Sequence, residues 1–248
     1  MMKDILGQAI SDYFHGVRGN KLWVHTQPTA GETGHENSRR SPRDSGPYPR
    51  EEMPVKTYFR AMDEMPELEW IALQQCRGRI LDIGAGAGSH SLALQQLGQE
   101  VTALEISPLS ASVIKDRGVA QVRCQDFFDL AGEEKFDTLL LMMNGIGIAG
   151  SLEGLRAFFR KARALLSPGG TLVFDSSDIA YLYEGKPPPA PGYYGELIYQ
   201  YEYRRQLSDR FPWLFIDRRT LAQIAATEDW QMELLFEDNQ DQYLVKCR

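Results

Sequence analysis

The hydrophobic positions from residue 79 onward follow two spacings in turn, short apolar runs and longer runs with helical periodicity. The short runs, which we interpret as buried strands, are residues 79–83, 101–106, 121–124, 136–143 and 171–175. The runs with helical spacing are residues 89–97, 108–117 and 152–166. Strands that alternate with helices favour a parallel sheet covered by helices on both faces.

The pattern changes after Asp178. Residues 196–206 alternate as a strand with one exposed face does, and the side chains expected on one face are Leu197, Tyr199, Tyr201 and Tyr203. Residues 218–227 predict a helix, whereas the apolar runs at 232–237 and 243–246 flank a turn-rich segment and predict an antiparallel hairpin. The expected fold class is therefore α/β, with a doubly wound, mostly parallel seven-stranded sheet that ends in a C-terminal antiparallel hairpin.

The first 65 residues are less regular, and we interpret them as an N-terminal helical and loop extension to a main domain at residues 66–248. Within this extension, residues 5–14 predict a helix and residues 21–25 form a short apolar run. Residues 27–50 are rich in Gly, Pro, Ser and Arg, with hardly an apolar side chain. Because such a segment buries too little surface to offset its ordering entropy, we expect a mobile loop that is a candidate lid.

Composition narrows the range of partners. The formal net charge is −7, and a negative field repels nucleic acid at long range, which favours a small-molecule substrate. The 3 cysteines are scattered and lack metal-ligand spacing, so we expect reduced thiols, a cytoplasmic location and no bound metal. The chain starts without the apolar run of a signal peptide, and its most apolar stretch, residues 138–150, is too short to span a bilayer. No membrane role is expected.

A glycine-rich segment, Leu-Asp-Ile-Gly-Ala-Gly-Ala-Gly at residues 81–88, lies where the first strand turns into a helix. Glycines there permit backbone angles closed to other residues and let a ligand approach the main chain. The following helix directs its free N–H groups at the same place. A dinucleotide site has the spacing G-x-G-x-x-G/A, but the third position counted from Gly84 is Ser89, and the third glycine is Gly88 instead.

The observed spacing, G-x-G-x-G, resembles the motif of class I S-adenosylmethionine-dependent methyltransferases, and the resemblance extends through about residues 66–248. It implies that Asp82 helps to hold the methionine part of S-adenosylmethionine. It also implies that the adenosine and methionine parts lie over the loop backbone, which assigns to the cofactor the residues Gly84, Ala85, Gly86 and Gly88.

Glu105 ends the second predicted strand, about twenty residues past the glycine loop. A carboxylate in that place can accept hydrogen bonds from both hydroxyls of an adenosine ribose. By the family resemblance, the neighbouring Ile106 packs against adenine. The resemblance also implies that Asp126, at the end of the third strand, accepts a hydrogen bond from the adenine amino group. It implies that Phe127 lines the adenine ring. The alternatives are that Asp126 caps a helix or that Asp129 takes its role.

The resemblance places Asn144 and Gly145, at the end of the fourth strand, against the sulfonium and the substrate. Family members that methylate amino groups of bases carry Asn/Asp-Pro-Pro-aromatic there. This chain has Asn-Gly-Ile-Gly, which argues against nucleic acid as the acceptor. Tyr58 and Phe59 either cap the sulfonium by cation–π contact or simply pack.

Methyl transfer is an in-line displacement that depends chiefly on positioning and on exclusion of water. A general base is needed only where the nucleophile must lose a proton, so no catalytic residue is assigned. His15, His25 and His90 are candidates, each more consistent with a structural or surface role. The leading hypothesis is a methyltransferase that converts S-adenosylmethionine to S-adenosylhomocysteine with a small-molecule acceptor. The alternatives are a non-catalytic nucleotide-binding module and a nicotinamide-dependent oxidoreductase.

Overall fold

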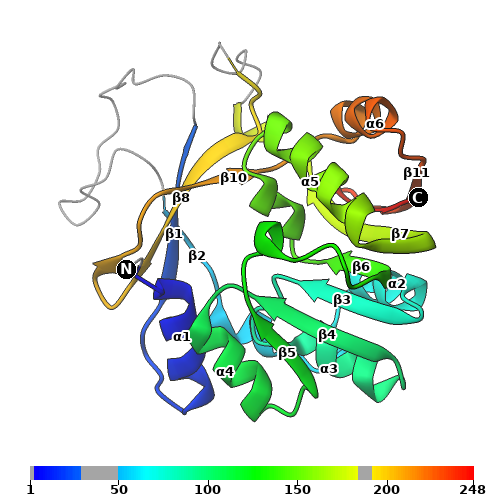
Figure 1. The fold of residues 1–248 in the computed structure, drawn as a ribbon. Helices are drawn as coiled ribbons and strands as arrows, with labels where there is room; N and C mark the ends of the chain where they lie inside the picture. Colours follow the sequence, from blue (N-terminus) through cyan, green and yellow to red (C-terminus); the bar gives the residue numbers. More distant parts are fainter. Residues whose placement is uncertain (1–2, 29–49, 184–191) are drawn as a thin grey trace.

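A computed structural model describes residues 3–28, 50–183 and 192–248 of the chain (Figure 1). Most of the predicted mobile loop, residues 29–49, lies outside these ranges. Its ends lie in strands, because β1 is Leu22–Pro28 and β2 is Arg50–Glu52. Among the described residues, no helix combines the length and the apolar character needed to cross a bilayer.

The larger of two sheets has seven strands and matches the predicted fold class. Its strands, in spatial order, are β11 (Met232–Glu237), β12 (Gln242–Cys247), β7 (Leu166–Ser177), β6 (Phe136–Leu141), β3 (Arg79–Ile83), β4 (Glu100–Glu105) and β5 (Gln121–Cys124). The five strands from β7 to β5 are parallel, and β12 and β11 add an antiparallel hairpin beyond β7. The predicted doubly wound sheet with its closing hairpin is confirmed.

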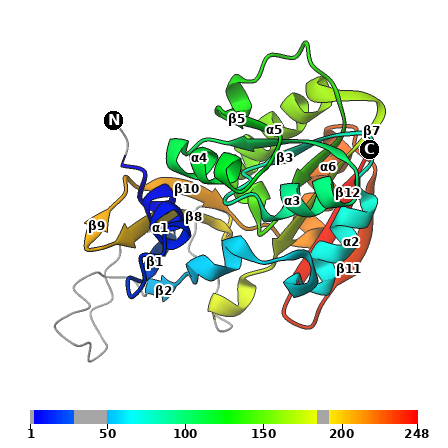
Figure 2. The same ribbon diagram turned by 90° about the horizontal axis from the view of Figure 1, so that it is seen from below.

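Helices cover both faces of this sheet (Figure 2). One face packs on α2 (Glu67–Gln75) and α3 (Ser89–Gln96) through Ile80, Leu140 and Val173. The other packs on α5 (Leu152–Leu165) and α6 (Arg218–Thr227), and the strand residues involved include Leu81, Leu139 and Phe174. Successive strand residues alternate between the two cores because side chains point to opposite faces. Near β5, the sheet is covered by α4 (Pro108–Asp116), which begins with the N-cap Ser107.

The second sheet is antiparallel and was not predicted as a unit. Its strands are β10 (Phe211–Leu214), β8 (Glu196–Tyr203), β1 and β2, and the short strand β9 (Gln206–Leu207) also pairs with β8. The register joins Trp23 to Glu202 and Pro28 to Leu197, so strands on both sides of the predicted boundary at residue 65 share one sheet. That boundary stays a prediction.

Helix α1 (Ile5–Phe14) joins the second sheet to the first (Figures 1 and 2). The Tyr203 hydroxyl on β8 donates to Asp12 of α1 at 3.0 Å. At the other end of the helix, the Ser107 hydroxyl donates to Asp4 at 2.6 Å, and Asp4 also caps α1 by accepting from the Gly7 N–H. The N-terminal helix therefore fixes the second sheet beside the start of α4.

Candidate functional site

The glycine loop leaves the carboxyl end of β3 and enters α3. The three glycines have positive φ angles, which residues with a Cβ rarely adopt: +71° at Gly84, +61° at Gly86 and +83° at Gly88. The Leu104 carbonyl at the end of β4 accepts from the N–H groups of Gly84 and Ala85, at 2.9 and 3.1 Å. The loop is thus fastened to the neighbouring strand, and its glycine spacing follows from its backbone angles.

Each glycine has different surroundings at the position where a Cβ would stand. At Gly84 nothing lies within 4 Å of that position, so the loop borders open space. At Gly86 the Tyr58 ring would be 2.9 Å away, and at Gly88 the Ile114 side chain of α4 would be 3.1 Å away. Room for a ligand therefore begins at the first glycine, whereas the third lets α3 and α4 pack closely.

The Glu105 carboxylate lies directly beside this loop. It accepts from the Gly86 N–H at 2.8 Å and from the Ser107 N–H at 2.9 Å. Burial raises the pKa of Glu105 to about 7, although these backbone hydrogen bonds oppose the shift and the nearby Asp4 adds to it. Both oxygens keep lone pairs for further donors, since a carboxylate offers about four acceptor positions. The geometry suits a pair of hydroxyls, and the assignment to ribose stays a prediction.

The residues predicted to bind adenine follow β4 and β5. The Ile106 side chain is 57% exposed, as a ligand-facing apolar residue would be. Asp126 caps the short helix η3 (Phe127–Asp129) by accepting from the Phe128 N–H at 2.8 Å. The buried Phe127 ring lies 4.7 Å from the Phe158 ring of α5, while Phe128 is exposed. Asp126 thus caps a helix, which was the alternative to an adenine role. Contact of Phe127 with adenine stays a prediction.

Asp82, at the end of β3, belongs to a buried polar cluster beneath the loop. Its carboxylate accepts from the Ser91 hydroxyl at 2.6 Å, and burial raises its pKa. His90 Nε2 contacts Glu69 of α2 at 3.0 Å, and Arg60 pairs with the same carboxylate. Burial alone would lower the pKa of His90, but Glu69 and Asp82 raise it overall. The cluster connects α2, α3 and Arg60 beneath the part of the site that is expected to hold the methionine end of the cofactor.

The end of β6 is held in an unusual backbone conformation. Met143 and Asn144 have φ angles of +60° and +56°, which cost free energy in residues other than glycine and occur at functional sites. The Asn144 N–H donates to both Asp175 oxygens at 3.0 Å. The side-chain amide of Asn144 accepts from Ser176 and donates to the Leu214 carbonyl. Asn144 therefore links β6 to β7 and to β10 of the second sheet.

This linkage bears on the role expected for Asn144 at the sulfonium. Each polar end of its side chain makes one hydrogen bond within the protein, so one N–H and one lone pair of the amide remain for a ligand. Gly145 begins the short helix η4 (Gly145–Ala149), and a Cβ there would lie 3.0 Å from Leu141. Burial raises the pKa of Asp175 to about 6, against the hydrogen bond from Asn144. The contribution of both residues to cofactor binding stays a prediction.

The remaining candidate residues lie at different distances from the glycine loop. Tyr58, in the short helix η1 (Val55–Phe59), lies over Gly86, and its carbonyl accepts from the Ser89 hydroxyl at 2.8 Å. Phe59 packs against the Tyr13 ring instead. His15 is exposed and bonds within α1, while His25 pairs with Glu202 on the second sheet. Of these side chains, only Tyr58 borders the glycine loop.

Sequence reasoning missed Glu69, Arg60 and Tyr201 as members of this region. Glu69 lies on α2, whose apolar positions Leu68, Ala72 and Leu73 follow Pro66, and this pattern was the available signal for the helix. Nothing local in the sequence indicates that Tyr201, from β8, lies near the glycine loop. It packs against the same apolar cluster as Tyr58 and as Ala87 of that loop.

Comparison with known proteins finds methyltransferases. The family profile described as "Methyltransferase domain" matches residues 80–170. The chain is 33% identical over 105 residues to a cypemycin N-terminal methyltransferase of Streptomyces sp, covering 41% of this chain and 42% of that protein. It is 32% identical over 118 residues to a ubiquinone biosynthesis O-methyltransferase of Xanthomonas euvesicatoria, covering 44% of this chain and 48% of that protein. Each match spans less than half of the curated relative.

A solved structure is similar over nearly the whole chain. It is a SAM-dependent methyltransferase from Bacteroides fragilis in complex with S-adenosyl-L-homocysteine, 39% identical, with a TM-score of 0.84. The match covers 99% of this chain and 94% of that one. The DhpI-SAM-HEP complex, at 21% identity and a TM-score of 0.58, shares the fold. The chain belongs to the S-adenosylmethionine-dependent methyltransferases.

Proposed function

We propose that this chain binds S-adenosylmethionine at the carboxyl edge of its parallel sheet and transfers the methyl group to a small-molecule acceptor. The observation that carries the proposal is the Glu105 carboxylate, bonded to the Gly86 N–H beside the open space at Gly84. A relative that matches 99% of this chain, solved with S-adenosyl-L-homocysteine bound, supports the choice of cofactor. The net charge of −7 supports a small acceptor rather than nucleic acid.

The residues present fit such a cofactor. Glu105 offers acceptor positions for the two ribose hydroxyls, and the exposed Ile106 offers an apolar surface for adenine. Asp82 provides a carboxylate for the methionine end. The full set proposed to hold the cofactor is Asp82, Gly84, Ala85, Gly86, Gly88, Glu105, Ile106, Asp126, Phe127, Asn144 and Gly145.

The bound cofactor would supply a methyl group already activated by its positive sulfur. The chain's own task is then to orient the acceptor and to exclude water. Tyr58 lies over the second glycine, and the Asn144–Asp175 linkage fixes the end of β6 beside it. No described side chain is assigned as a general base. The cytoplasmic location expected from the cysteines remains a proposal, supported by free thiols at Cys76, Cys124 and Cys247.

Calorimetric titration with S-adenosylhomocysteine tests this proposal. Glu105→Ala should weaken binding by about 1.5–3 kcal/mol, roughly 10–150-fold, because charge-assisted hydrogen bonds are lost. Glu100→Ala is the matched control, since Glu100 begins the same strand that Glu105 ends and is exposed. The control should bind as the wild type does.

The same titration separates the competing functions. No binding of either S-adenosylmethionine or S-adenosylhomocysteine by the wild type would overturn the proposal, and binding of NAD instead would indicate an oxidoreductase. Binding of S-adenosylmethionine without transfer of labelled methyl to any component of a metabolite extract would indicate a non-catalytic module.

A further inference from the structure

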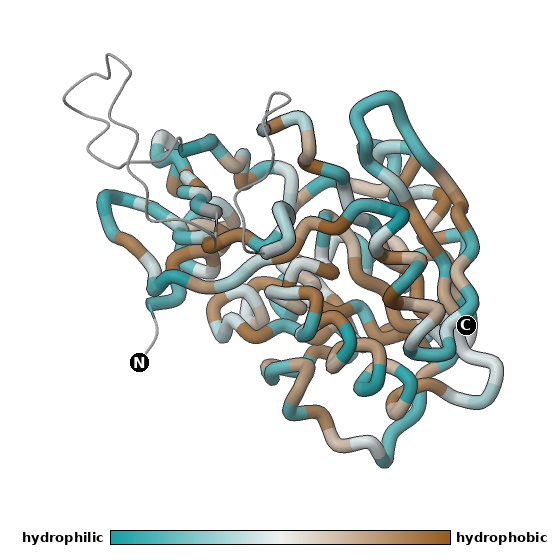
Figure 3. Tube along the Cα trace, turned by 90° about the horizontal axis from the view of Figure 1, so that it is seen from above, coloured by the Kyte–Doolittle hydropathy of each residue, from teal (hydrophilic) through white to brown (hydrophobic). Residues whose placement is uncertain are grey.

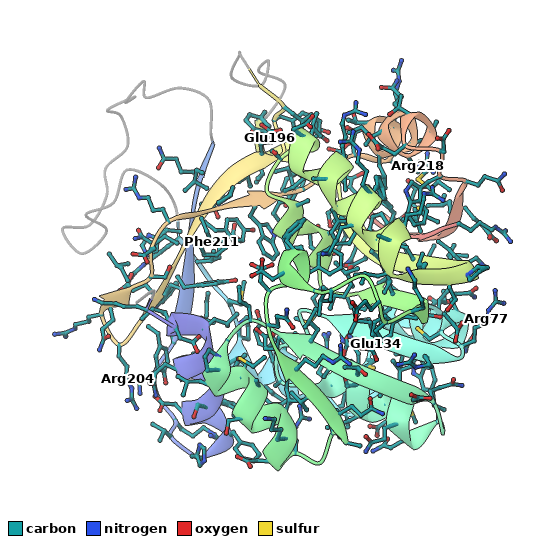
Figure 4. The ribbon with its side chains drawn as sticks, in the orientation of Figure 1. Arg77, Glu134, Glu196, Arg204, Phe211 and Arg218 are labelled. Atoms are coloured by element: carbon teal, nitrogen blue, oxygen red, sulfur yellow. The ribbon has the colours of Figure 1, made fainter. Side chains whose placement is uncertain are left out.

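One face of the second sheet is lined by aromatic rings. Directly paired residues of an antiparallel sheet lie on the same face, and the register pairs Tyr199 with Phe211 and Trp213 with Leu197. Alternation along β8 adds Tyr201 and Tyr203 to this side. We call these residues the aromatic face: Tyr199, Tyr201, Tyr203, Phe211 and Trp213. Figure 4 labels Phe211 on β10, in the half of the molecule built by the second sheet.

The aromatic face spans the carboxyl edge of the parallel sheet. At one end, the Trp213 ring packs so closely on Gly147, just beyond β6, that a Cβ there would lie 2.2 Å from it. Tyr199 shares an apolar cluster with Ile179, which follows β7. Near β4, Tyr201 and Tyr203 pack in the same apolar cluster as Tyr58 and as Ala87 of the glycine loop. The face thus extends from the ends of β6 and β7 to the glycine loop.

The rings form a connected group that retains accessible surface. The Tyr199 ring stacks on Trp213 at 5.7 Å, and Tyr201 lies 5.2 Å from Phe211. Tyr201, Phe211 and Trp213 are all only half-buried. Within the described ranges, the Tyr201 hydroxyl has no hydrogen-bond partner. These side chains can therefore offer ring faces and one phenolic oxygen to a bound molecule.

The charged residues at the strand positions of this face are negative. The described strand positions on this side of β1, β2, β8 and β10 carry no lysine, arginine or histidine. The acidic groups beside it are Glu105 and Glu51, which pairs with Val24 and contributes to the raised pKa of Tyr199 after burial. The opposite face is different, because Arg50 lies 4.4 Å from the Trp23 ring centre there. At the end of the face, the Arg204 guanidinium lies 5.5 Å from the Tyr203 ring centre, but it is paired with Asp12 at 2.8 Å. An anionic ligand would therefore find no unpaired counter-charge at the described strand positions of this face.

Resting on the proposed methyltransferase function, we propose that the aromatic face binds the methyl acceptor and that this acceptor is a small molecule with a protonated amine. Aromatic faces attract cations through the ring quadrupole, most strongly where water is excluded. Glu51 adds attraction of the same sign, and Glu105 does so in its ionised form. The Tyr201 hydroxyl oxygen can accept from an N–H group. Phosphorylated and carboxylated acceptors are disfavoured by the same charges.

Such an acceptor must react as the neutral amine. The ammonium first loses a proton to water, which leaves a lone pair on nitrogen. That lone pair forms the new N–C bond to the methyl carbon as the C–S bond breaks, and the C–S electron pair stays on sulfur. The product is a methylated ammonium and a neutral thioether, so charge and atoms balance without a further reactant.

Binding of three probes of similar shape tests the inference without relying on turnover. Benzyltrimethylammonium, benzyl alcohol and benzoate are titrated into protein saturated with S-adenosylhomocysteine, and dissociation constants are measured by calorimetry. The ammonium should bind most tightly and benzoate most weakly. Phe211→Leu and Tyr201→Leu should each weaken ammonium binding by about 2–30-fold.

The matched control is Trp23→Leu, which removes an aromatic ring from the same sheet but on the opposite face. It should leave ammonium binding unchanged. Tyr201→Phe keeps the ring and provides a folded variant if Tyr201→Leu is unstable; it should retain ammonium binding within about threefold. In a second assay, labelled methyl should pass from S-adenosylmethionine to benzylmethylamine and not to benzyl alcohol.

Two results would overturn the inference. One is benzoate or benzyl alcohol binding as tightly as the ammonium, and the other is a Trp23→Leu effect as large as that of Phe211→Leu. Both leave the proposed function standing if S-adenosylhomocysteine binds. Failure of S-adenosylhomocysteine itself to bind would overturn the proposed function as well.

Discussion

The two sheets of this protein reach their architecture by different routes. The strands around the glycine loop follow one another in sequence, and each is connected to the next through a short turn or helix. The second sheet joins β1 to β8, and the contact between His25 and Glu202 spans 177 positions. The cofactor side is thus encoded in one continuous stretch, whereas the surface facing the acceptor is assembled from distant segments.

The interiors of the two regions differ as well. Around the parallel sheet, Leu81, Phe158 and Leu172 are fully buried at 0% exposure. On the second sheet, Tyr201 and Phe211 keep accessible surface. Figure 3 shows hydrophobic segments in the interior and hydrophilic turns at the periphery. The difference suggests that the first region supplies most of the stability, while the second keeps surface available for a ligand.

The largest expected effect tests this division directly. Phe158→Ala should lower the free energy of unfolding by about 3–5 kcal/mol, because the buried ring leaves a cavity beside Phe127 and Phe159. Phe211→Ala removes the same side chain from a half-buried position and should cost less than half as much. Urea unfolding followed by circular dichroism measures both. Equal losses would mean that the second sheet is as tightly packed as the first.

The next effect concerns pH. The folded-state pKa of Glu105 is about 7, above the ordinary 4.5, chiefly because of burial. Folding therefore favours the protonated form, so this contribution is fully present below about pH 4.5 and is lost as pH rises through about 7, a change of about 3 kcal/mol. Glu105→Gln should remove this pH dependence in unfolding measured without cofactor at about pH 5 and pH 8.

Tyr201→Phe is the control for this pH effect. The tyrosine, whose pKa is raised by burial, stays neutral throughout this range and should leave the slope unchanged. If wild type and Glu105→Gln lost stability in parallel between the two pH values, another group would be responsible. The pH dependence would then not distinguish the cofactor side from the second sheet.

The smallest effect tests the charged contacts within the second sheet. The Glu202 carboxylate on β8 pairs with His25 of β1 at 2.8 Å and with Arg50 of β2 at 3.1 Å. Because these side chains keep 20–29% of their surface exposed to solvent, Glu202→Gln should cost only about 0.2–1 kcal/mol. The urea midpoint measures this cost. A loss above about 3 kcal/mol would show that charges, rather than apolar packing, hold the sheet together.

Much of the parallel half could be predicted because its signals are local. The strand at 121–124 and the helix at 218–227 were predicted with the bounds that the structure has. The helix α2 was missed although its apolar positions follow Pro66, whereas the contact of its Glu69 with His90 joins two separate helices and has no local signal. Asn144 was expected against the sulfonium, but its side-chain contacts with Ser176 and Leu214 depend on strands that meet only in the fold.

The parallel sheet, the glycine loop and the place of Glu105 could be read from local patterns, because backbone angles and strand periodicity are properties of neighbouring residues. Which side chains pack around the loop depends on the tertiary fold. The position of Tyr58 over Gly86 and the packing of Tyr201 against the cluster that contains Ala87 both depend on separate elements. Burial and cross-sheet contacts depend on residues far apart in the chain, so no local pattern records them.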